Sequence, residues 1–127
     1  MSENQIDVAR AICRVADLSD PGTRAFTIGS GDWPLKGFVV RKGNQVFAYL
    51  NRCPHAGHPL NWQANDFLTL DDALIICRSH GALFDISSGL CVAGPCGGAH
   101  LRSIAVRIEH DYIMLVDDPD VLAAQMA

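Results

Sequence analysis

Two short stretches decide how this chain is interpreted: Cys53-Pro54-His55-Ala56-Gly57-His58-Pro59-Leu60 and Cys77-Arg78-Ser79-His80-Gly81-Ala82-Leu83-Phe84-Asp85. Each stretch contains a cysteine followed closely by a histidine, and 21 residues lie between His55 and Cys77. Each also follows a segment expected to be a strand, while neighbouring glycines and prolines let the backbone fold closely around a bulky group. The pattern predicts two loops that each offer a thiolate and an imidazole to a metal centre.

Short segments rich in branched and aromatic residues surround these loops and are separated by turn signals, a pattern typical of an antiparallel all-β domain. The expected strands are Ala11 to Val15, Arg24 to Ile28, Gly37 to Arg41, Gln45 to Leu50, Phe67 to Leu70, Ala73 to Ile76, Leu83 to Ile86, Leu90 to Val92, Leu101 to Ile108 and Tyr112 to Val116. A short helix is expected from Asp120 to Met126, with Asp117 or Asp118 as its N-terminal cap.

The composition fits one domain covering residues 1–127, because 127 residues can bury a modest core without disulfides. The formal charge of −4, with only 10 scattered Lys and Arg, argues against a nucleic-acid partner. We expect no membrane span, since no apolar run reaches about 18 residues. No secretory signal is visible at the start, so a reducing cytoplasmic setting is expected, where cysteines are more naturally thiols or metal ligands than disulfides.

The two stretches resemble the Rieske family, whose pattern is C-x-H in a first loop and C-x-x-H in a second. The likeness extends through Ser88-Gly89 and Gly94-Pro95 and covers about residues 35–116. It implies a Rieske-like antiparallel β-sandwich with a small cluster-binding subdomain, about residues 51–98, formed by two loops. It also implies one [2Fe-2S] cluster per chain, with Cys53 and Cys77 on one iron and His55 and His80 on the other.

High-potential members of that family add a cysteine to each loop and join the two by a disulfide. This chain has His58 and Ser79 at those positions, so no such bridge is expected. Those members also present a Ser and a Tyr hydroxyl to the cluster, whereas this chain has Ala82 and Phe84. Because hydrogen bonds to the sulfurs stabilise the reduced state, a potential near the lower end of the Rieske range is expected, roughly −150 mV.

The remaining histidines and cysteines are weaker candidates. His58 is interpreted mainly as a loop histidine, with a role near the cluster left open, and His100 and His110 as ordinary surface residues. Cys13, Cys91 and Cys96 are expected to be small buried residues rather than ligands. Leu60 and Pro95 are candidates for shielding the cluster from water.

The function implied by the resemblance is a monomeric one-electron carrier, a Rieske-type ferredoxin between a reductase and a terminal oxygenase or similar acceptor. A catalytic oxygenase is not expected, because it needs a further iron on two histidines and a carboxylate. Two alternatives stay open. One is a Rieske-like small subunit of a larger reductase or oxygenase complex. The other is a structural zinc module, since two cysteines and two histidines also form a common zinc site.

Overall fold

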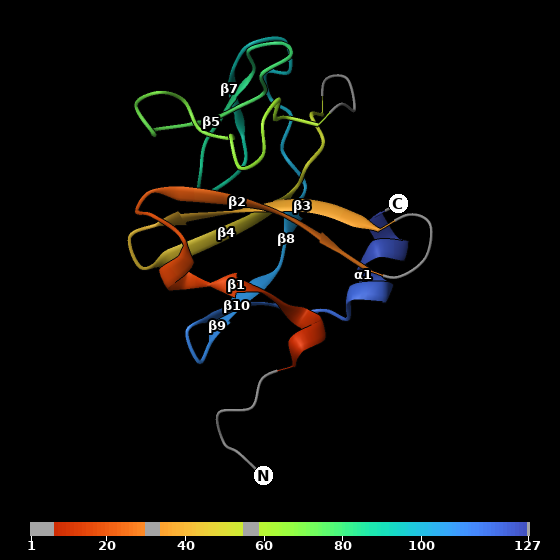
Figure 1. Ribbon diagram of the computed structural model, residues 1–127. Coiled ribbons are helices and arrows are strands. Elements are labelled where there is room, and N and C mark those ends of the chain that lie inside the picture. Colours follow the sequence, from red (N-terminus) through yellow and green to blue (C-terminus); the bar gives the residue numbers. More distant parts are fainter. Residues whose placement is uncertain (1–6, 30–33, 55–58, 127) are drawn as a thin grey trace.

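The computed structural model describes residues 7–29, 34–54 and 59–126, in which antiparallel strands form three sheets (Figure 1). The central sheet has the order β2 (Gly22–Ile28), β3 (Leu35–Lys42), β4 (Gln45–Leu50) and β8 (Ser103–Ile104). The outer sheet has the order β1 (Ala11–Arg14), β10 (Tyr112–Leu115) and β9 (Val106–Glu109). The small sheet has the order β5 (Ile75–Ile76), β6 (Leu83–Phe84) and β7 (Cys91–Ala93). The outer and small sheets lie on opposite sides of the central sheet.

Helices are short and peripheral. Two single-turn 3₁₀ helices, Val8–Arg10 and Val15–Asp17, flank β1, and α1 (Pro119–Met126) follows β10. Asp118 caps α1 as predicted, because its Oδ1 accepts hydrogen bonds from the backbone N–H groups of Asp120 and Val121 at 3.0 and 3.2 Å. In the described part of the chain no helix is long and apolar enough to cross a membrane.

Strand β3 separates two buried cores because successive side chains of a strand point to opposite faces. Phe38, Val39 and Val40 are all fully buried, which is typical of a strand covered on both sides. Val39 belongs to the core shared with the outer sheet, whereas Phe38 and Val40 belong to the core beneath the small sheet. This second core joins the central sheet to the part of the chain that carries the cysteine and histidine loops.

The predicted antiparallel β-sandwich is confirmed, and two of the expected strands are corrected. Phe67 to Leu70 forms no strand, because only Leu68 makes a bridge, to Ile75, before the chain turns at Asp71-Asp72. Leu101 to Ile108 is two strands, not one. Ser103–Ile104 pairs with β4 and Val106–Glu109 pairs with β10, so the chain leaves the central sheet at Ala105 and enters the outer sheet.

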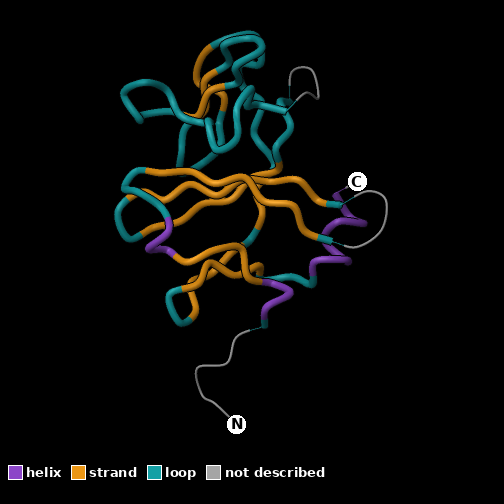
Figure 2. The backbone as a smooth tube through the Cα atoms, viewed as in Figure 1, coloured by secondary structure: helices purple, strands orange, loops and turns teal. Residues whose placement is uncertain are grey.

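The part of the molecule above the central sheet consists mainly of loops (Figure 2). The strands of the small sheet are only two or three residues long. Loop backbone there is fixed by turns such as the one at Asp85, whose carboxylate accepts hydrogen bonds from the Ser88 hydroxyl and N–H at 2.7 and 2.8 Å and from the Ser87 hydroxyl at 2.9 Å. The hydrogen bonds from Ser88 and Ser87 hold the pKa of Asp85 below its ordinary value.

Tyr49 connects β4 to that loop region, and its hydroxyl donates a 2.6 Å hydrogen bond to the Ile86 carbonyl. Burial, followed by the nearby Asp85 carboxylate, raises the pKa of Tyr49 to about 12. An unfolded tyrosine ionises near pH 10, so the folded state binds more protons between these two values, and stability must fall as pH rises through that window. The loss from this one residue is about 3 kcal/mol at most, from about two pKa units at about 1.4 kcal/mol each.

Tyr49→Phe is therefore expected to reduce the alkaline loss of stability between about pH 10 and 12, measured by urea unfolding at a series of pH values. Part of the alkaline loss of stability should remain in this variant, because burial also raises the pKa of Cys96 to about 12. At neutral pH the variant should be less stable by about 1–3 kcal/mol, since the Ile86 carbonyl loses its partner. Tyr112→Phe is the matched control at the other tyrosine, and an equal change in both variants would contradict the assignment.

Candidate metal centre

The first of the two stretches predicted to carry ligands, which we call the first ligand loop, is described at residues 51–54 and 59–60 and is held by Asn51. The Asn51 side chain accepts a hydrogen bond from the Leu60 N–H at 2.8 Å and donates one to Asn61 Oδ1 at 3.0 Å. The Asn51 N–H donates to the Lys36 carbonyl of β3 at 3.0 Å, which fixes the loop to the central sheet. Asn51 at the start of the loop is thus bonded to Leu60 at its end, and Cys53 lies between them in the sequence.

The second ligand loop, residues 77–82, is a tight turn that leads into β6. The Cys77 N–H donates to the Ala82 carbonyl at 2.9 Å, and the Gly81 N–H donates to the Cys77 carbonyl at 2.8 Å. Closing this turn requires a left-handed backbone at Gly81, where φ is +72°. The turn buries Cys77 and leaves His80 exposed, so the two predicted ligands of this loop lie at different depths.

The two ligand loops are directly bonded to each other. The Arg78 N–H donates to the Leu60 carbonyl at 2.8 Å, so Leu60 receives the second loop with its carbonyl while its N–H bonds to Asn51. Cys53 and Cys77 are both fully buried and belong to one hydrophobic cluster that also contains Leu60. The structure therefore brings the two predicted thiol ligands into the same buried region.

Two of the histidines discussed above, His55 and His58, lie outside the described residues. His100 and His110 are exposed, as expected for surface histidines. Among residues 7–29, 34–54 and 59–126, no three His, Cys, Asp or Glu side chains are grouped as a site for a single metal ion.

A third segment, residues 93–99, packs against the second ligand loop. A Cβ on Gly94 would lie 2.8 Å from the Ala82 Cα, and Gly94 has a φ of +96°, so only glycine allows this close approach. Leu60 is fully buried, which fits a shielding role, whereas Pro95 is exposed. Segment 93–99 thus closes over the turn that carries Cys77.

The other cysteines are buried, as predicted. All five cysteines lie within the described residues, and none forms a disulfide. Cys13 lies in the core between the central and outer sheets, away from the ligand loops. The Cys96 thiol donates to Cys91 Sγ at 2.9 Å, and burial together with this contact raises the pKa of Cys96 to about 12. Cys91 and Cys96 are therefore packed as thiols beside the candidate site.

Ala82 and Phe84, the two positions at which the sequence resemblance led us to expect missing hydroxyl groups, are both fully buried in the cluster that contains Cys53 and Cys77. Neither side chain has a hydrogen-bond donor. A hydroxyl group introduced at either position would therefore lie within the buried cluster that contains Cys53 and Cys77.

Several residues that shape the loops were missed by sequence reasoning. One signal in the sequence could have identified Asn51. It is a polar residue directly after a strand and two positions before the predicted ligand Cys53, a place from which a side chain can bond to the loop backbone. Asn65 and Asp66 gave no signal, since an acidic or amide residue between two short segments looks like any surface turn. Their partners, in β2 and in the second ligand loop, are more than ten positions away in the sequence.

Comparisons with known proteins agree with this fold. Residues 9–116 match the family model of the Rieske [2Fe-2S] domain. Ferredoxin CarAc of Metapseudomonas resinovorans is 32% identical over 85 residues, which are 67% of this chain and 72% of that protein. The ferredoxin of carbazole 1,9a-dioxygenase from Nocardioides aromaticivorans has a similar structure, with a TM-score of 0.65 and 25% identity, covering 84% of this chain and 93% of that one.

Human apoptosis-inducing factor 3 is 30% identical over 118 residues, which are 93% of this chain, but this chain spans only 18% of that protein's length. The likeness to the ferredoxins, in contrast, extends over most of their length. On the match of residues 9–116, which is most of the sequence, the chain belongs to the Rieske [2Fe-2S] domain family.

Proposed function

We propose that this protein is a Rieske-type ferredoxin, a one-electron carrier rather than an enzyme, that holds one [2Fe-2S] cluster on Cys53, His55, Cys77 and His80. The observation that carries the proposal is the bonding of the two ligand loops to each other at Leu60 and Arg78, with both cysteines buried in one cluster beneath them. The cluster-binding part is proposed to be about residues 51–98 of a single domain, residues 1–127.

The described donors fit such a group. Two buried thiols without a disulfide suit anionic sulfur ligands, and an exposed imidazole in the same turn suits a ligand at the protein surface. When bound, a [2Fe-2S] cluster supplies a one-electron redox couple. The chain's own residues hold the thiol side in a dry region and leave His80 at the surface, where a partner protein can approach closely.

The direct experiment is metal and sulfide analysis of the purified protein with an anaerobic redox titration. We expect about two iron atoms and about two acid-labile sulfides per chain, visible absorption, and uptake of one electron. A colourless protein with one zinc per chain would overturn the proposal in favour of a structural zinc site.

Asn51→Ala tests the base of the first ligand loop. The substitution leaves the N–H of buried Leu60 without its partner, which costs about 1–3 kcal/mol, and it frees the loop that contains Cys53. We expect several-fold faster release of iron to a chelator. Asn61→Ala is the control, because it removes the second Asn51 contact but leaves the Leu60 N–H paired. Equal release rates for Asn51→Ala and the wild type would show that Asn51 does not hold the loop.

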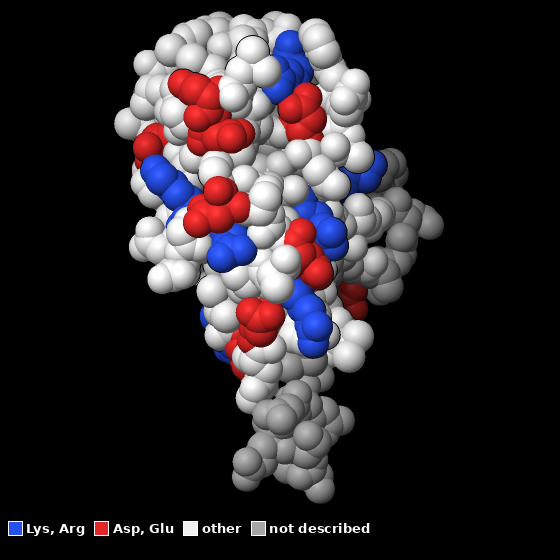
Figure 3. Space-filling model, turned by 60° about the vertical axis from the view of Figure 1, so that its left-hand side comes forward, with Lys and Arg blue, Asp and Glu red and all other residues white. Residues whose placement is uncertain are grey.

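The proposed partners are a reductase as electron donor and a terminal oxygenase as acceptor, because the similar Nocardioides protein is the ferredoxin of a dioxygenase. On the face drawn in Figure 3, acidic and basic side chains are interspersed rather than separated into patches of one sign. Docking is expected to be transient, as in other redox pairs with small interfaces. A cytoplasmic location and a monomeric state are part of the same proposal.

A second candidate is a stable subunit or domain of a larger reductase or oxygenase, favoured by the relative of which this chain spans only 18%. Size-exclusion chromatography of cell extract separates the two candidates. A free carrier elutes at the size of the chain, and a subunit elutes with a larger complex.

A further inference from the structure

Four consecutive residues, Asn65 to Leu68, join the second ligand loop to the central sheet; we call them the linking segment. Asn65 bonds to β2, because its carbonyl accepts from the Thr23 hydroxyl at 2.6 Å and its Oδ1 accepts from the Ala25 N–H at 2.7 Å. Phe67 stacks on Phe38 of β3, with ring centroids 4.2 Å apart and planes at 7°. The linking segment is therefore anchored on the central sheet at two adjacent strands.

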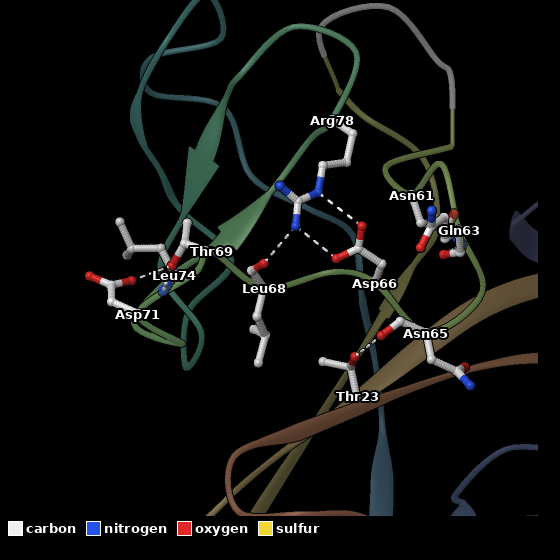
Figure 4. Close-up of polar contacts among 10 residues, drawn as sticks. All are labelled: Thr23, Asn61, Gln63, Asn65, Asp66, Leu68, Thr69, Asp71, Leu74 and Arg78. Carbon is white, nitrogen blue, oxygen red and sulfur yellow. Dashed lines mark hydrogen bonds and ion pairs between the residues drawn. The ribbon is translucent and has the colours of Figure 1, made fainter.

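The same segment holds the second ligand loop through an ion pair (Figure 4). Arg78, which directly follows Cys77, donates from Nε to Asp66 Oδ2 at 3.1 Å and from a terminal nitrogen to Asp66 Oδ1 at 2.7 Å. That terminal nitrogen also donates to the Leu68 carbonyl at 3.0 Å. A two-point guanidinium–carboxylate contact fixes orientation as well as distance. Arg78 thus binds the first ligand loop with its backbone and the linking segment with its side chain.

We propose that Asp66 and Arg78 act as a compensated charge pair: their ion pair positions the second ligand loop, and the Asp66 carboxylate cancels the effect that the Arg78 cation alone would have on the reduction potential. The inference rests on the proposed function, because it requires a redox centre at Cys77 and His80. Asp66 and Arg78 are positioning residues, since neither is a proposed ligand.

The physical argument concerns the charge that reduction adds. A nearby cation stabilises an added electron and a nearby anion opposes it, while a paired cation and anion largely cancel. The side chains of Arg78 and Asp66 are 23% and 35% exposed, and both line a surface groove of about 370 Å³. Their influence is therefore partly screened by solvent, and it must weaken as ionic strength rises.

Removing the charge of Asp66 and removing the charge of Arg78 should shift the reduction potential in opposite directions. Asp66→Asn leaves the Arg78 cation uncompensated, so the reduction potential should rise. Arg78→Gln leaves the Asp66 anion uncompensated, so the potential should fall. The double variant removes both charges and should return close to the wild-type potential. A loss of packing alone has no reason to reverse its sign between the two single variants, which separates a charge effect from a general loosening of the loop.

Arg78→Lys separates charge from position. Lysine keeps the cation but cannot form the two-point contact. We expect a potential close to that of the wild type together with several-fold faster loss of iron to a chelator, because the loop is held less firmly.

The experiment is a potentiometric titration of the purified iron-loaded proteins, monitored by visible absorption and electron paramagnetic resonance, at low and high salt. The matched control is the exposed pair Arg107 and Glu109 on β9, replaced in the same way, which lies on the far side of the central sheet and should leave the potential unchanged. Opposite shifts that shrink at high salt support the proposal. Shifts of one sign, or none, overturn it.

If Arg78→Gln fails to retain iron, Asp66→Asn and Arg78→Lys decide the question. A raised potential in Asp66→Asn with an unchanged potential in Arg78→Lys supports the charge pair, and any other combination overturns it. A wild-type protein without iron and sulfide defeats the proposed function itself. An iron-loaded wild type whose variants keep its potential defeats only the inference about Asp66 and Arg78.

Discussion

Cys77→Ser is expected to leave the purified protein almost without iron. Cys77 is fully buried, and its turn is fixed by backbone hydrogen bonds between Cys77 and the residues Ala82 and Gly81. Serine supplies a hydroxyl instead of a thiolate, which is a far poorer ligand for iron in such clusters. Because metal binding is coupled to folding, the iron-free variant should also unfold at a lower urea concentration.

The matched control is Cys13→Ser, which makes the same chemical change in the core between the central and outer sheets. That variant should lose some stability but keep its iron. Measurement of iron per chain in both variants decides the outcome. Full iron content in Cys77→Ser would remove Cys77 from the ligand set and with it the assignment of the second loop.

Phe67→Ala should produce a large loss of stability, about 3–5 kcal/mol. Phe67 is fully buried and stacks on Phe38, so its removal leaves a cavity between the central sheet and the loop region. Asn65 and Asp66 directly precede Phe67 and bond to Ala25 and Arg78, respectively. The cavity should therefore loosen the linking segment as well. Urea unfolding of the iron-loaded protein measures the change in the free energy of unfolding.

Leu70→Ala is the control for Phe67→Ala, because Leu70 lies three residues further along the chain and is fully exposed. Its expected effect is within about 0.5 kcal/mol. Similar losses for the two variants would mean that Phe67 does not join the loop region to the central sheet.

The tight turn at residues 77–82 was predictable because its signals are local. Cysteine and histidine at short spacing, with Gly81 at a left-handed position, define the second turn within a few residues. The strands with tight turns were also predictable. His110 and Asp111 have φ values of 50° and 68°, as the turn between β9 and β10 requires.

The remaining features depend on contacts that the sequence does not display. Leu101 to Ile108 has the composition of one continuous strand, and only the pairing partners show that the chain changes sheets at Ala105. Likewise, Phe67 to Leu70 has the residues of a strand, but Phe67 is used for packing on Phe38 rather than for a long ladder. The bonds from Asn51 to Leu60 and from Arg78 to Asp66 link positions that only the fold brings together.

The measurement that tests the central claim most directly is pulsed electron paramagnetic resonance of the reduced protein, because it detects nitrogen nuclei bound to the paramagnetic iron. The proposed ligand set puts the imidazoles of His55 and His80 on one iron, so the spectrum should contain couplings from two nitrogen ligands. His80→Cys should remove one of them, while the exposed control His110→Ala should leave both. A reduced cluster without nitrogen coupling would contradict the account, since neither imidazole would then be bound to the paramagnetic iron.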